Sequence, residues 1–270
     1  MEHFEGHGDH FNALGFEDDE ILENIPKFFE NGILAKNYIY EISVENSRIL
    51  PYMYPEINDV QICSLIESKN NKNIIESFYP VLEGIKNSIV IGNKYTWENN
   101  LEGEIEIIRE DNFNLSFFAP FYLNNFSDKK NGSDVEAYLS GLAFFVEEAM
   151  MNFEVDKGDM YEIALRNFLN DNPGKTKGDF PSVTLHMDGA IMLFPTHSYS
   201  VYEYRGKILD LGYVTFLNKK LAKLKVCIEK TDEKYNLFIN LYVELNNVRN
   251  CELKIGKEIQ CTFWLMGYTK

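Results

Sequence analysis

From residue 182 onward the sequence consists of short apolar segments separated by polar turns, and this pattern restricts the fold more than any other feature. Segments of this length that are rich in β-branched and aromatic residues are typical of strands. About seven strands with a turn roughly every ten residues predict a small barrel, like the oligonucleotide-binding (OB) fold, or a sandwich. Asp188 and Gly189 predict a tight hairpin turn between the first two strands. The segments are SVTLHM, AIMLF, SYSVYEY, LDLGYVTFL, LAKLKVCIEK, NLFINLYVEL and EIQCTFWLMGY.

Near the N-terminus, the spacing of apolar residues predicts an amphipathic helix. After Asp18 and Asp19, apolar side chains recur every three or four residues, which places them on one face of a helix. Asn31 and Gly32 form a typical helix stop. Pro26 either kinks this helix or marks its true start, because proline lacks the amide donor that a helix interior requires.

Three segments after this helix have strand patterns. Residues 38–44 and 60–67 predict strands that are joined through a turn around Pro51 and Pro55. In residues 101–108, glutamates alternate with mainly apolar residues. Because alternate side chains of a strand point to opposite faces, one face of this third strand is expected to be acidic.

Two further helices are predicted from capping-box patterns, in which a short polar residue precedes a glutamate by three positions. Ser133 with Glu136 begins such a box, and the apolar spacing in residues 135–150 favours a helix. A strand is the alternative for the first half of that segment. A second box at Asp159 precedes a helical pattern over residues 160–171.

Charge divides the chain unevenly. The protein has 26 Lys+Arg against 42 Asp+Glu, a formal net charge of −16, which opposes direct binding to nucleic acid or anionic lipid. Residues 1–174 contain 12 basic and 32 acidic residues, whereas residues 175–270 contain 14 and 10. We therefore expect an α+β fold in two regions, an acidic α+β region over residues 1–174 and a β-rich, barrel-like or sandwich region over residues 175–270. One continuous unit is the alternative.

The sequence contains no segment near the roughly 18 consecutive apolar residues that span a membrane, and its first residues lack the basic and apolar regions of a signal peptide. No CxxC pair occurs, which argues against a zinc ribbon, a thioredoxin motif or a disulfide framework. We expect a cytoplasmic protein that does not bind membranes and whose thiols are reduced. The cysteines are Cys63, Cys227, Cys251 and Cys261.

Residues 10–21, HFNALGFEDDEI, follow an HFxxLGF pattern, and residues 255–268, IGKEIQCTFWLMGY, follow a GxxIxxxxWLxGY pattern. These stretches resemble the start and the end of an uncharacterised family of bacterial cytoplasmic proteins, and residues 97–122 and 201–217 agree with it more loosely. Cys261 departs from the family pattern, in which a small glycine is usual. The resemblance implies a bacterial cytoplasmic protein with glycines at turns and Trp and Phe in a core. It implies no catalytic or binding residues.

Common catalytic motifs are absent from the sequence. It lacks a GxSxG nucleophile elbow, an HExxH zinc motif, a GxxxxGK[ST] phosphate loop and a GxGxxG loop after a strand. Neighbouring carboxylates are frequent, but in an acidic protein such pairs are usually solvated. We therefore predict a binding protein that is not an enzyme, with no catalytic residues and no cofactor.

Three of the five histidines, His3, His7 and His10, lie close to Glu5 and Asp9. Imidazoles and carboxylates are ligands for divalent metals, so a metal-dependent hydrolase that uses these histidines is one alternative function. A closed metal site needs rigid ligands, whereas chain ends next to glycines are usually mobile. The sequence therefore predicts a solvated terminus and no metal site.

Glu102, Glu104 and Glu106 are expected to form an acidic row on the strand predicted over residues 101–108, because alternate residues of a strand lie about 6.6–6.8 Å apart. A nucleic-acid strand also presents regularly spaced negative charge. We expect this surface to bind a basic partner protein, as an inhibitor or immunity protein acting on a nucleic-acid-binding target. The simpler interpretation is a solvent face whose charges prevent aggregation. The same surface is expected to include Asp18, Asp19, Glu20 and Glu23.

A second alternative is an oligonucleotide-binding protein that uses the C-terminal barrel. Exposed aromatic rings in a basic groove stack on bases. Alternating aromatics on a strand are more often core residues, however, and the net charge opposes phosphate contacts. The residues in question are Tyr199, Tyr202, Tyr204, Tyr213, Arg205, Lys207, Lys219, Lys220, Lys223 and Lys225.

Overall fold

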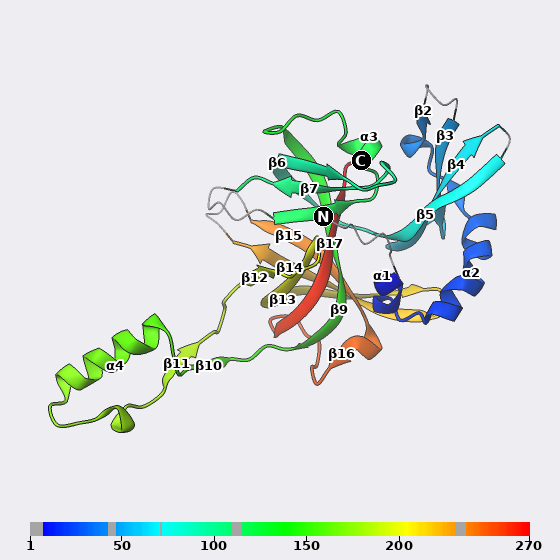
Figure 1. Cartoon of the computed structure of the whole chain (residues 1–270). Coiled ribbons are helices and arrows are strands. Elements are labelled where there is room, and N and C mark those ends of the chain that lie inside the picture. The colour runs from blue at the N-terminus through cyan, green and yellow to red at the C-terminus, as the bar shows by residue number, and fades with distance from the viewer. Residues whose placement is uncertain (1–7, 43–46, 71, 110–114, 231–235) are drawn as a thin grey trace. The chain divides into compact units, whose positions relative to one another are not determined.

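The computed structural model describes residues 8–42, 47–70, 72–109, 115–230 and 236–270. Its strand content of 53%, against 17% helix, makes it a β-rich α+β fold, which confirms the coarse fold class. The chain divides into two compact units, a larger one of Met1–Glu148 with Ile191–Lys270 and a smaller one of Ala149–Ala190 (Figure 1). The predicted division after residue 174 falls inside the smaller unit.

The larger unit contains most of the elements. Its helices are α1 (Gly8–Ala13), α2 (Asp18–Glu30) and α3 (Tyr122–Asn125), with the 3-10 turns η1 (Lys36–Tyr38) and η3 (Leu245–Asn247). The first strands are β1 (Ile33–Leu34), β2 (Tyr40–Ile42), β3 (Ser47–Tyr54), β4 (Val60–Lys69) and β5 (Lys72–Leu82). The later strands are β6 (Ile85–Thr96), β7 (Gly103–Ile107), β8 (Leu115–Ala119), β9 (Asp134–Glu148), β12 (Met192–Pro195), β13 (Val201–Phe216), β14 (Lys219–Glu229), β15 (Leu237–Glu244), β16 (Val248–Arg249) and β17 (Glu258–Tyr268).

The first five strands form an antiparallel sheet in the order β1-β3-β4-β5, with β2 paired to β3. Helix α2 contacts β3 and β4 and buries Ile21 and Phe28, as the amphipathic pattern predicts, and Pro26 lies inside it. Pro51 is not in a turn, because it lies within β3. The chain turns only from Pro55 onward, between β3 and β4.

The second sheet has ten strands, and its pairings close into rings. The path β12-β13-β14-β15-β9-β17-β8-β7-β6 is joined by extra pairings between β13 and β17 and between β9 and β6. In a simple barrel each strand has two neighbours, whereas β9 pairs with β6, β15, β16 and β17 (Figure 1). The sheet is therefore ring-like but not a barrel, and the barrel predicted for the C-terminal region is wrong.

Residues 135–150, for which the sequence predicts a helix, lie mostly in strand β9. Both faces of β9 are buried, since Leu139 belongs to one hydrophobic core and Leu142 to the other. A strand that is buried on both faces has a nearly continuous apolar sequence, which imitates helical spacing. The helix is wrong and the alternative strand is right. Gly141 allows close packing here, because a Cβ at this position would lie 2.7 Å from Phe263 Cδ2.

Two details of the predicted C-terminal strands are also wrong. SYSVYEY and LDLGYVTFL contribute to one long strand, β13, rather than to two strands. Asp188 and Gly189 do not close a hairpin, because β11 (Val183–His186) pairs with β10 (Asn152–Val155) whereas β12 pairs with β13. The last three predicted strands correspond to β14, β15 and β17.

The smaller unit consists of the antiparallel strands β10 and β11, the helix α4 (Asp159–Asp171) and the 3-10 turn η2 (Lys177–Asp179). Helix α4 confirms the helix predicted over residues 160–171. The ring of Phe180 lies 5.4 Å from that of Tyr161 and 5.3 Å from that of Phe168. Leu165 is buried in this unit, whereas Met160 and Ile163 are exposed.

Candidate functional site

A cleft of about 430 Å³ lies in the larger unit between its two sheets. This volume falls within the range of about 300–1,000 Å³ that is typical of ligand pockets. Residues of β1, β3, β4 and β5 line it from the small sheet, and Phe121 and the end of β17 line it from the large sheet. The lining residues are Ile33, Leu34, Ala35, Tyr38, Met53, Glu56, Ile57, Asn58, Asp59, Gln61, Val81, Leu82, Glu83, Phe121, Tyr268 and Lys270.

The inner wall of the cleft is apolar and aromatic. Leu82 and Phe121 are buried there, and the ring of Tyr38 stacks on Phe121 with 4.0 Å between the centroids and 7° between the planes. Two lining residues are unusually exposed for apolar side chains, since Ile57 is 90% exposed and Ile33 is 48% exposed. The cleft therefore combines a rigid apolar wall with apolar side chains in contact with solvent.

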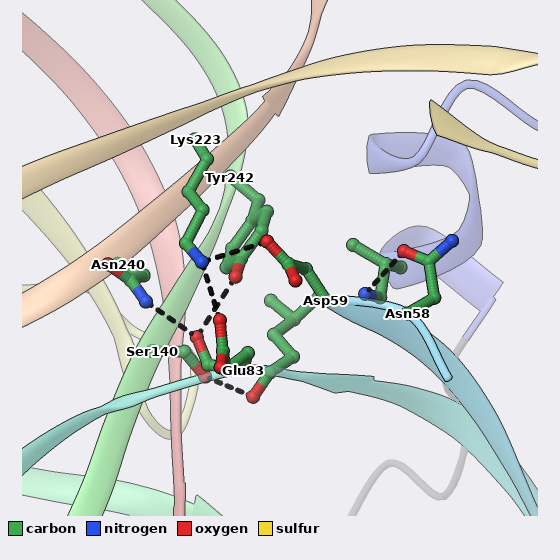
Figure 2. A network of polar contacts seen from close by, with 9 residues as sticks. Asn58, Asp59, Glu83, Ser140, Lys223, Asn240 and Tyr242 are labelled. Atoms are coloured by element: carbon green, nitrogen blue, oxygen red, sulfur yellow. Dashed lines mark hydrogen bonds and ion pairs between the residues drawn. The ribbon is translucent and has the colours of Figure 1, made fainter. Parts of the chain in front are cut away.

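The polar wall of the cleft is organised around one lysine (Figure 2). Lys223 Nζ, from β14, lies 2.8 Å from Asp59 Oδ2 and 2.5 Å from Glu83 Oε2. Partial burial lowers the pKa of Lys223, but hydrogen bonds and charge from both carboxylates outweigh it, and its pKa is raised overall. The lysine is therefore a cation that bridges two carboxylates, one just before β4 and one just after β5.

Side chains of the large sheet hold the backbone next to these carboxylates (Figure 2). Tyr242 Oη and Asn240 Nδ2 each donate a hydrogen bond of 3.0 Å to the carbonyl of Glu83. Ser140 Oγ donates to the carbonyl of Leu82 at 3.3 Å. Burial raises the pKa of the Tyr242 hydroxyl, and the charges of the cleft carboxylates raise it further, so Tyr242 stays protonated as a donor. These bonds connect the end of β5 to β9 and β15 and stabilise the shape of the cleft.

A second hollow, of about 700 Å³, lies beside the start of helix α2. None of the described residues that line it is basic. Glu244 is held in place, because its two carboxylate oxygens accept bonds of 2.7 and 3.1 Å from the backbone and side chain of Asn246. Glu17 precedes α2 but makes no side-chain capping bond. The lining residues are Asn12, Gly15, Phe16, Glu17, Asp19, Glu244, Asn246 and Asn247.

The predicted acidic row does not form one exposed surface. Glu102 is 1% exposed and Glu104 is 3% exposed, because β7 lies between β6 and β8 and its surroundings are buried. Ser77 Oγ and Asn99 Nδ2 donate to the carboxylate of Glu102. The exposure that alternation along the strand predicted is therefore wrong for these two residues.

Glu104 is a buried carboxyl group that forms no ion pair with a basic side chain among the described residues. Burial raises its pKa to about 8, against hydrogen bonds from Ser200 and Trp97 that lower it. Ser200 Oγ donates to Glu104 Oε2. Glu104 is thus mainly neutral at pH 7.

The third residue of the row has a different environment. Glu106 is only partly buried, and its carboxylate accepts hydrogen bonds from Asn93 and, at 3.0 Å, from Tyr95 Oη. The hydrogen bond from Tyr95 to Glu106 raises the pKa of that tyrosine. The row therefore contains both buried and solvent-accessible carboxyl groups.

The acidic residues predicted on helix α2 are partly available to a partner. Asp19 and Glu23 are exposed, and Asp19 lines the hollow beside the helix. Glu20 Oε2 instead accepts a bond of 2.9 Å from Lys219 Nζ, which lowers the pKa of Glu20. The side chain of Asp18 lies outside the described residues. Asp19 and Glu23 are therefore the predicted residues that the structure leaves most accessible on this helix.

The histidines do not gather into a site in the described part of the chain. His3 and His7 lie outside the described residues. His10 is buried, and its ring stacks on Trp264 with 3.5 Å between the centroids. Among the described residues, no cluster of three or more His, Cys, Asp or Glu side chains has the arrangement of a metal site.

Two of the four tyrosines considered for base stacking are core residues. Tyr202 and Tyr204 are buried, and their hydroxyl groups donate to the carbonyls of Ser116 and Cys227. Tyr199 and Tyr213 are exposed. The two tyrosines near the start of β13 are therefore not available to stack on bases.

Comparisons with protein-family models, with curated proteins and with solved structures find no match to this chain. No helix in the described part of the structure has the length and apolar character needed to cross a membrane. The resemblance to a bacterial family stays a prediction.

The sequence did not point to the cleft. Lys223 is separated by 164 residues from Asp59 and by 140 residues from Glu83, so no local spacing connects them. The one local signal is the Glu83-Gly84 pair, a polar interruption between two strand-like segments. A Cβ at Gly84 would lie 2.6 Å from the backbone of Tyr138, which explains why a glycine is present beside the cleft carboxylate.

Proposed function

We propose that this protein works by binding a basic partner protein, and that the acidic hollow beside α2 is the main contact. The observation that carries this proposal is the lining of the hollow, in which carboxylates of Glu17, Asp19 and Glu244 occur with amide side chains and no basic residue among those described. A lysine or arginine of a partner would meet acceptors there, while Lys219, whose ammonium group lies 5.0 Å from the centroid of the Phe16 ring, is paired with Glu20. Complementary charge of this kind favours association and excludes wrong partners.

The charge of the chain supports the same function. Residues 1–174 contain 32 acidic residues against 12 basic ones, and the exposed Glu23 extends the acidic surface along α2. A target that binds nucleic acid has a basic surface, because phosphate contacts dominate such binding. Occupation of that surface by an acidic protein would inhibit the target. We therefore propose an inhibitor or immunity type of action in the bacterial cytoplasm.

The proposal is tested by affinity purification from a nuclease-treated bacterial lysate, followed by titration of the purified partner. The test variant carries Glu17→Lys, Asp19→Lys and Glu23→Lys. Its matched control carries Asp128→Lys, Glu203→Lys and Glu252→Lys, three exposed residues whose reversal changes the total charge equally. We expect a basic protein to be recovered by the wild type and the control, and its dissociation constant to rise at least about tenfold, or about 1.4 kcal/mol, in the test variant.

Two results would contradict the proposal. Equal weakening by the test variant and the control would show that only total charge matters. If the wild-type protein recovers no basic protein, the proposed partner does not exist.

A further inference from the structure

We propose that the cleft between the two sheets of the larger unit is a binding site for a small organic cation, an amine with an aromatic or aliphatic body. This inference does not depend on the proposed protein partner, because it uses other residues and another class of ligand. Four properties of the cleft carry it: its fixed shape, its apolar wall, its exposed apolar lining and its charge.

The cleft is formed before a ligand binds. Tyr242, Asn240 and Ser140 fix the backbone of Leu82 and Glu83 through hydrogen bonds of 3.0, 3.0 and 3.3 Å (Figure 2). Lys223 at the same time holds the carboxylates of Asp59 and Glu83, and the large sheet therefore sets the position of the small-sheet strand ends. A site that is already ordered loses less conformational entropy when a ligand binds.

The apolar part of the cleft has room for the body of such a ligand. Leu82 and Phe121 are buried behind the wall, and Tyr38 stacks on Phe121 to extend the aromatic surface. Ile57 and Ile33, which also line the cleft, are exposed to water to the extent of 90% and 48%. An apolar body that covers such side chains removes apolar surface from water, which stabilises the complex by about 25 cal/mol per Å².

Charge selects a cation over an anion. Three carboxylates, those of Glu56, Asp59 and Glu83, line the cleft. Lys223 contacts Oδ2 of Asp59 and Oε2 of Glu83, so the second oxygen of each carboxylate keeps its capacity to accept. Glu56 is exposed and stands outside the bonds that Lys223 makes. The described lining contains a single cation, Lys270, whose ammonium group lies 4.3 Å from the centroid of the Tyr138 ring.

These groups leave a net negative charge for the ligand to neutralise. Counted with Lys223, the cleft has three carboxylates against two ammonium groups. A ligand with one positive charge makes the site neutral, whereas an anionic ligand increases the repulsion between like charges. Aromatic rings in the wall also favour a cation over a neutral molecule, through the negative faces of their π systems.

The experiment uses the full chain and three probes, tryptamine, tryptophol and indole-3-acetate. Each is an indole with a two-carbon side chain, and they differ in the charge of the group at its end. Binding is measured by calorimetric titration and located by protein-observed NMR. We expect tryptamine to bind at least about tenfold more tightly than the neutral tryptophol, and the anionic indole-3-acetate to bind most weakly.

Variants then locate the site. Glu56→Gln removes an exposed cleft carboxylate and is expected to weaken tryptamine binding about threefold or more, whereas Glu252→Gln, with the same charge change elsewhere, leaves it unchanged. Ala35→Trp places a large ring in the cleft from a partly exposed position and is expected to abolish binding. Circular dichroism and thermal unfolding show whether each variant is folded. If Ala35→Trp does not fold, Glu56→Gln still tests the site.

Three outcomes would overturn the proposal. Failure of tryptamine to bind at about 5 mM would show that the cleft has no useful affinity for an amine. Equal binding of all three probes would exclude selection by charge. Equal effects of Glu56→Gln and Glu252→Gln would place the bound amine elsewhere. None of these outcomes bears on the charge-reversal test of the protein partner, because that test alters the hollow beside α2.

Discussion

Two pairs of acidic residues in the larger unit have the same functional group, a carboxyl, in different environments. Asp59 and Glu83, in the cleft, are partly exposed and both contact Lys223, at 2.8 and 2.5 Å. Glu102 and Glu104, beside and on β7, are buried among hydroxyl, amide and indole groups. In the first pair a cation from a distant strand forms ion pairs with carboxylates that stay partly exposed.

This difference shows which acidic residues are available for binding. A buried carboxyl group without a cation avoids the free-energy penalty of desolvated charge by keeping its proton. Glu104 does so, with a pKa raised to about 8. Glu104 is buried inside the sheet, whereas the carboxylates of the cleft lie on a surface that a ligand can reach.

The largest effect is expected from Glu104→Lys. The substitution places an ammonium group in a buried site that the described structure provides with no carboxylate ion pair, and an uncompensated buried charge costs about 3–5 kcal/mol. We expect the free energy of unfolding, measured by urea denaturation, to fall by about 4–5 kcal/mol, so that the variant is largely unfolded. Glu106→Lys, two positions along the same strand but partly exposed, is the control and is expected to lose less than about 1 kcal/mol. Similar losses of stability in both variants would mean that Glu104 is no more buried than Glu106.

The next effect is a pH dependence that Glu104 imposes on stability. Its pKa is about 8 in the folded protein and near the ordinary glutamate value of 4.5 when unfolded. Between these values the unfolded chain has lost the proton while the folded protein keeps it, so stability falls as the pH rises from about 4.5 to about 8 and then levels off. The decline attributable to Glu104 is expected to be a few kcal/mol. Its upper limit is about 5 kcal/mol, since each unit of pKa difference corresponds to about 1.4 kcal/mol, and relaxation of the structure around the ionised carboxylate lowers it.

Glu104→Gln measures this contribution directly. The amide has the same shape and does not ionise, so the free energy of unfolding of the variant should lack the Glu104 part of the decline. Urea denaturation at several pH values between about 5 and 9 gives the comparison. Parallel pH profiles for wild type and variant would show that Glu104 is already ionised in the folded protein. Glu106→Gln is the matched control and should leave the profile nearly unchanged.

The contrast between the two pairs also explains what the sequence could predict. Local patterns correctly indicated α2 and α4, because amphipathic spacing and helix stops depend on neighbours in the chain. They failed for β9, where Leu139 and Leu142 face different cores and the apolar residues lose the two-residue period of a half-buried strand.

The candidate sites, too, could be predicted only where their residues are close in sequence. Alternation placed Glu102, Glu104 and Glu106 on one line but could not show that two of them are covered by the surrounding strands. The ion pair of Asp59 is made with Lys223, 164 residues away, and no short-range pattern contains that contact. The acidic start of α2 was recognisable because its residues are adjacent in sequence.

A smaller effect is expected when the cation of the cleft is removed. Lys223→Met deletes both ion pairs and leaves Asp59 and Glu83 as neighbouring carboxylates. Since all three side chains are partly solvated, we expect a loss of only about 1–2 kcal/mol at pH 7, measured by urea denaturation.

Lys225→Met is the matched control for this variant. Lys225 lies on the same strand, is exposed, and has its ammonium group 5.3 Å from the centroid of the Phe238 ring rather than beside a carboxylate. Its substitution is expected to change stability by less than about 0.5 kcal/mol. Equal losses for the two lysines would show that the Lys223 contacts do not hold the cleft together.

The smallest effect concerns Glu106, the accessible member of the row. Its carboxylate accepts a hydrogen bond from Tyr95 Oη, which is the main reason that the pKa of Tyr95 is raised. Glu106→Gln removes the negative charge, so the pKa of Tyr95 should move down toward its ordinary value, with little change in stability. NMR titration of protein with ¹³C-labelled tyrosine measures this shift at a single ring. A Tyr95 pKa that does not respond would mean that Glu106 is not a charged acceptor, and the contrast with its neutral neighbour Glu104 would fail. A shift would show that Glu106 interacts with Tyr95 at the partly exposed position of a row whose other two glutamates are buried.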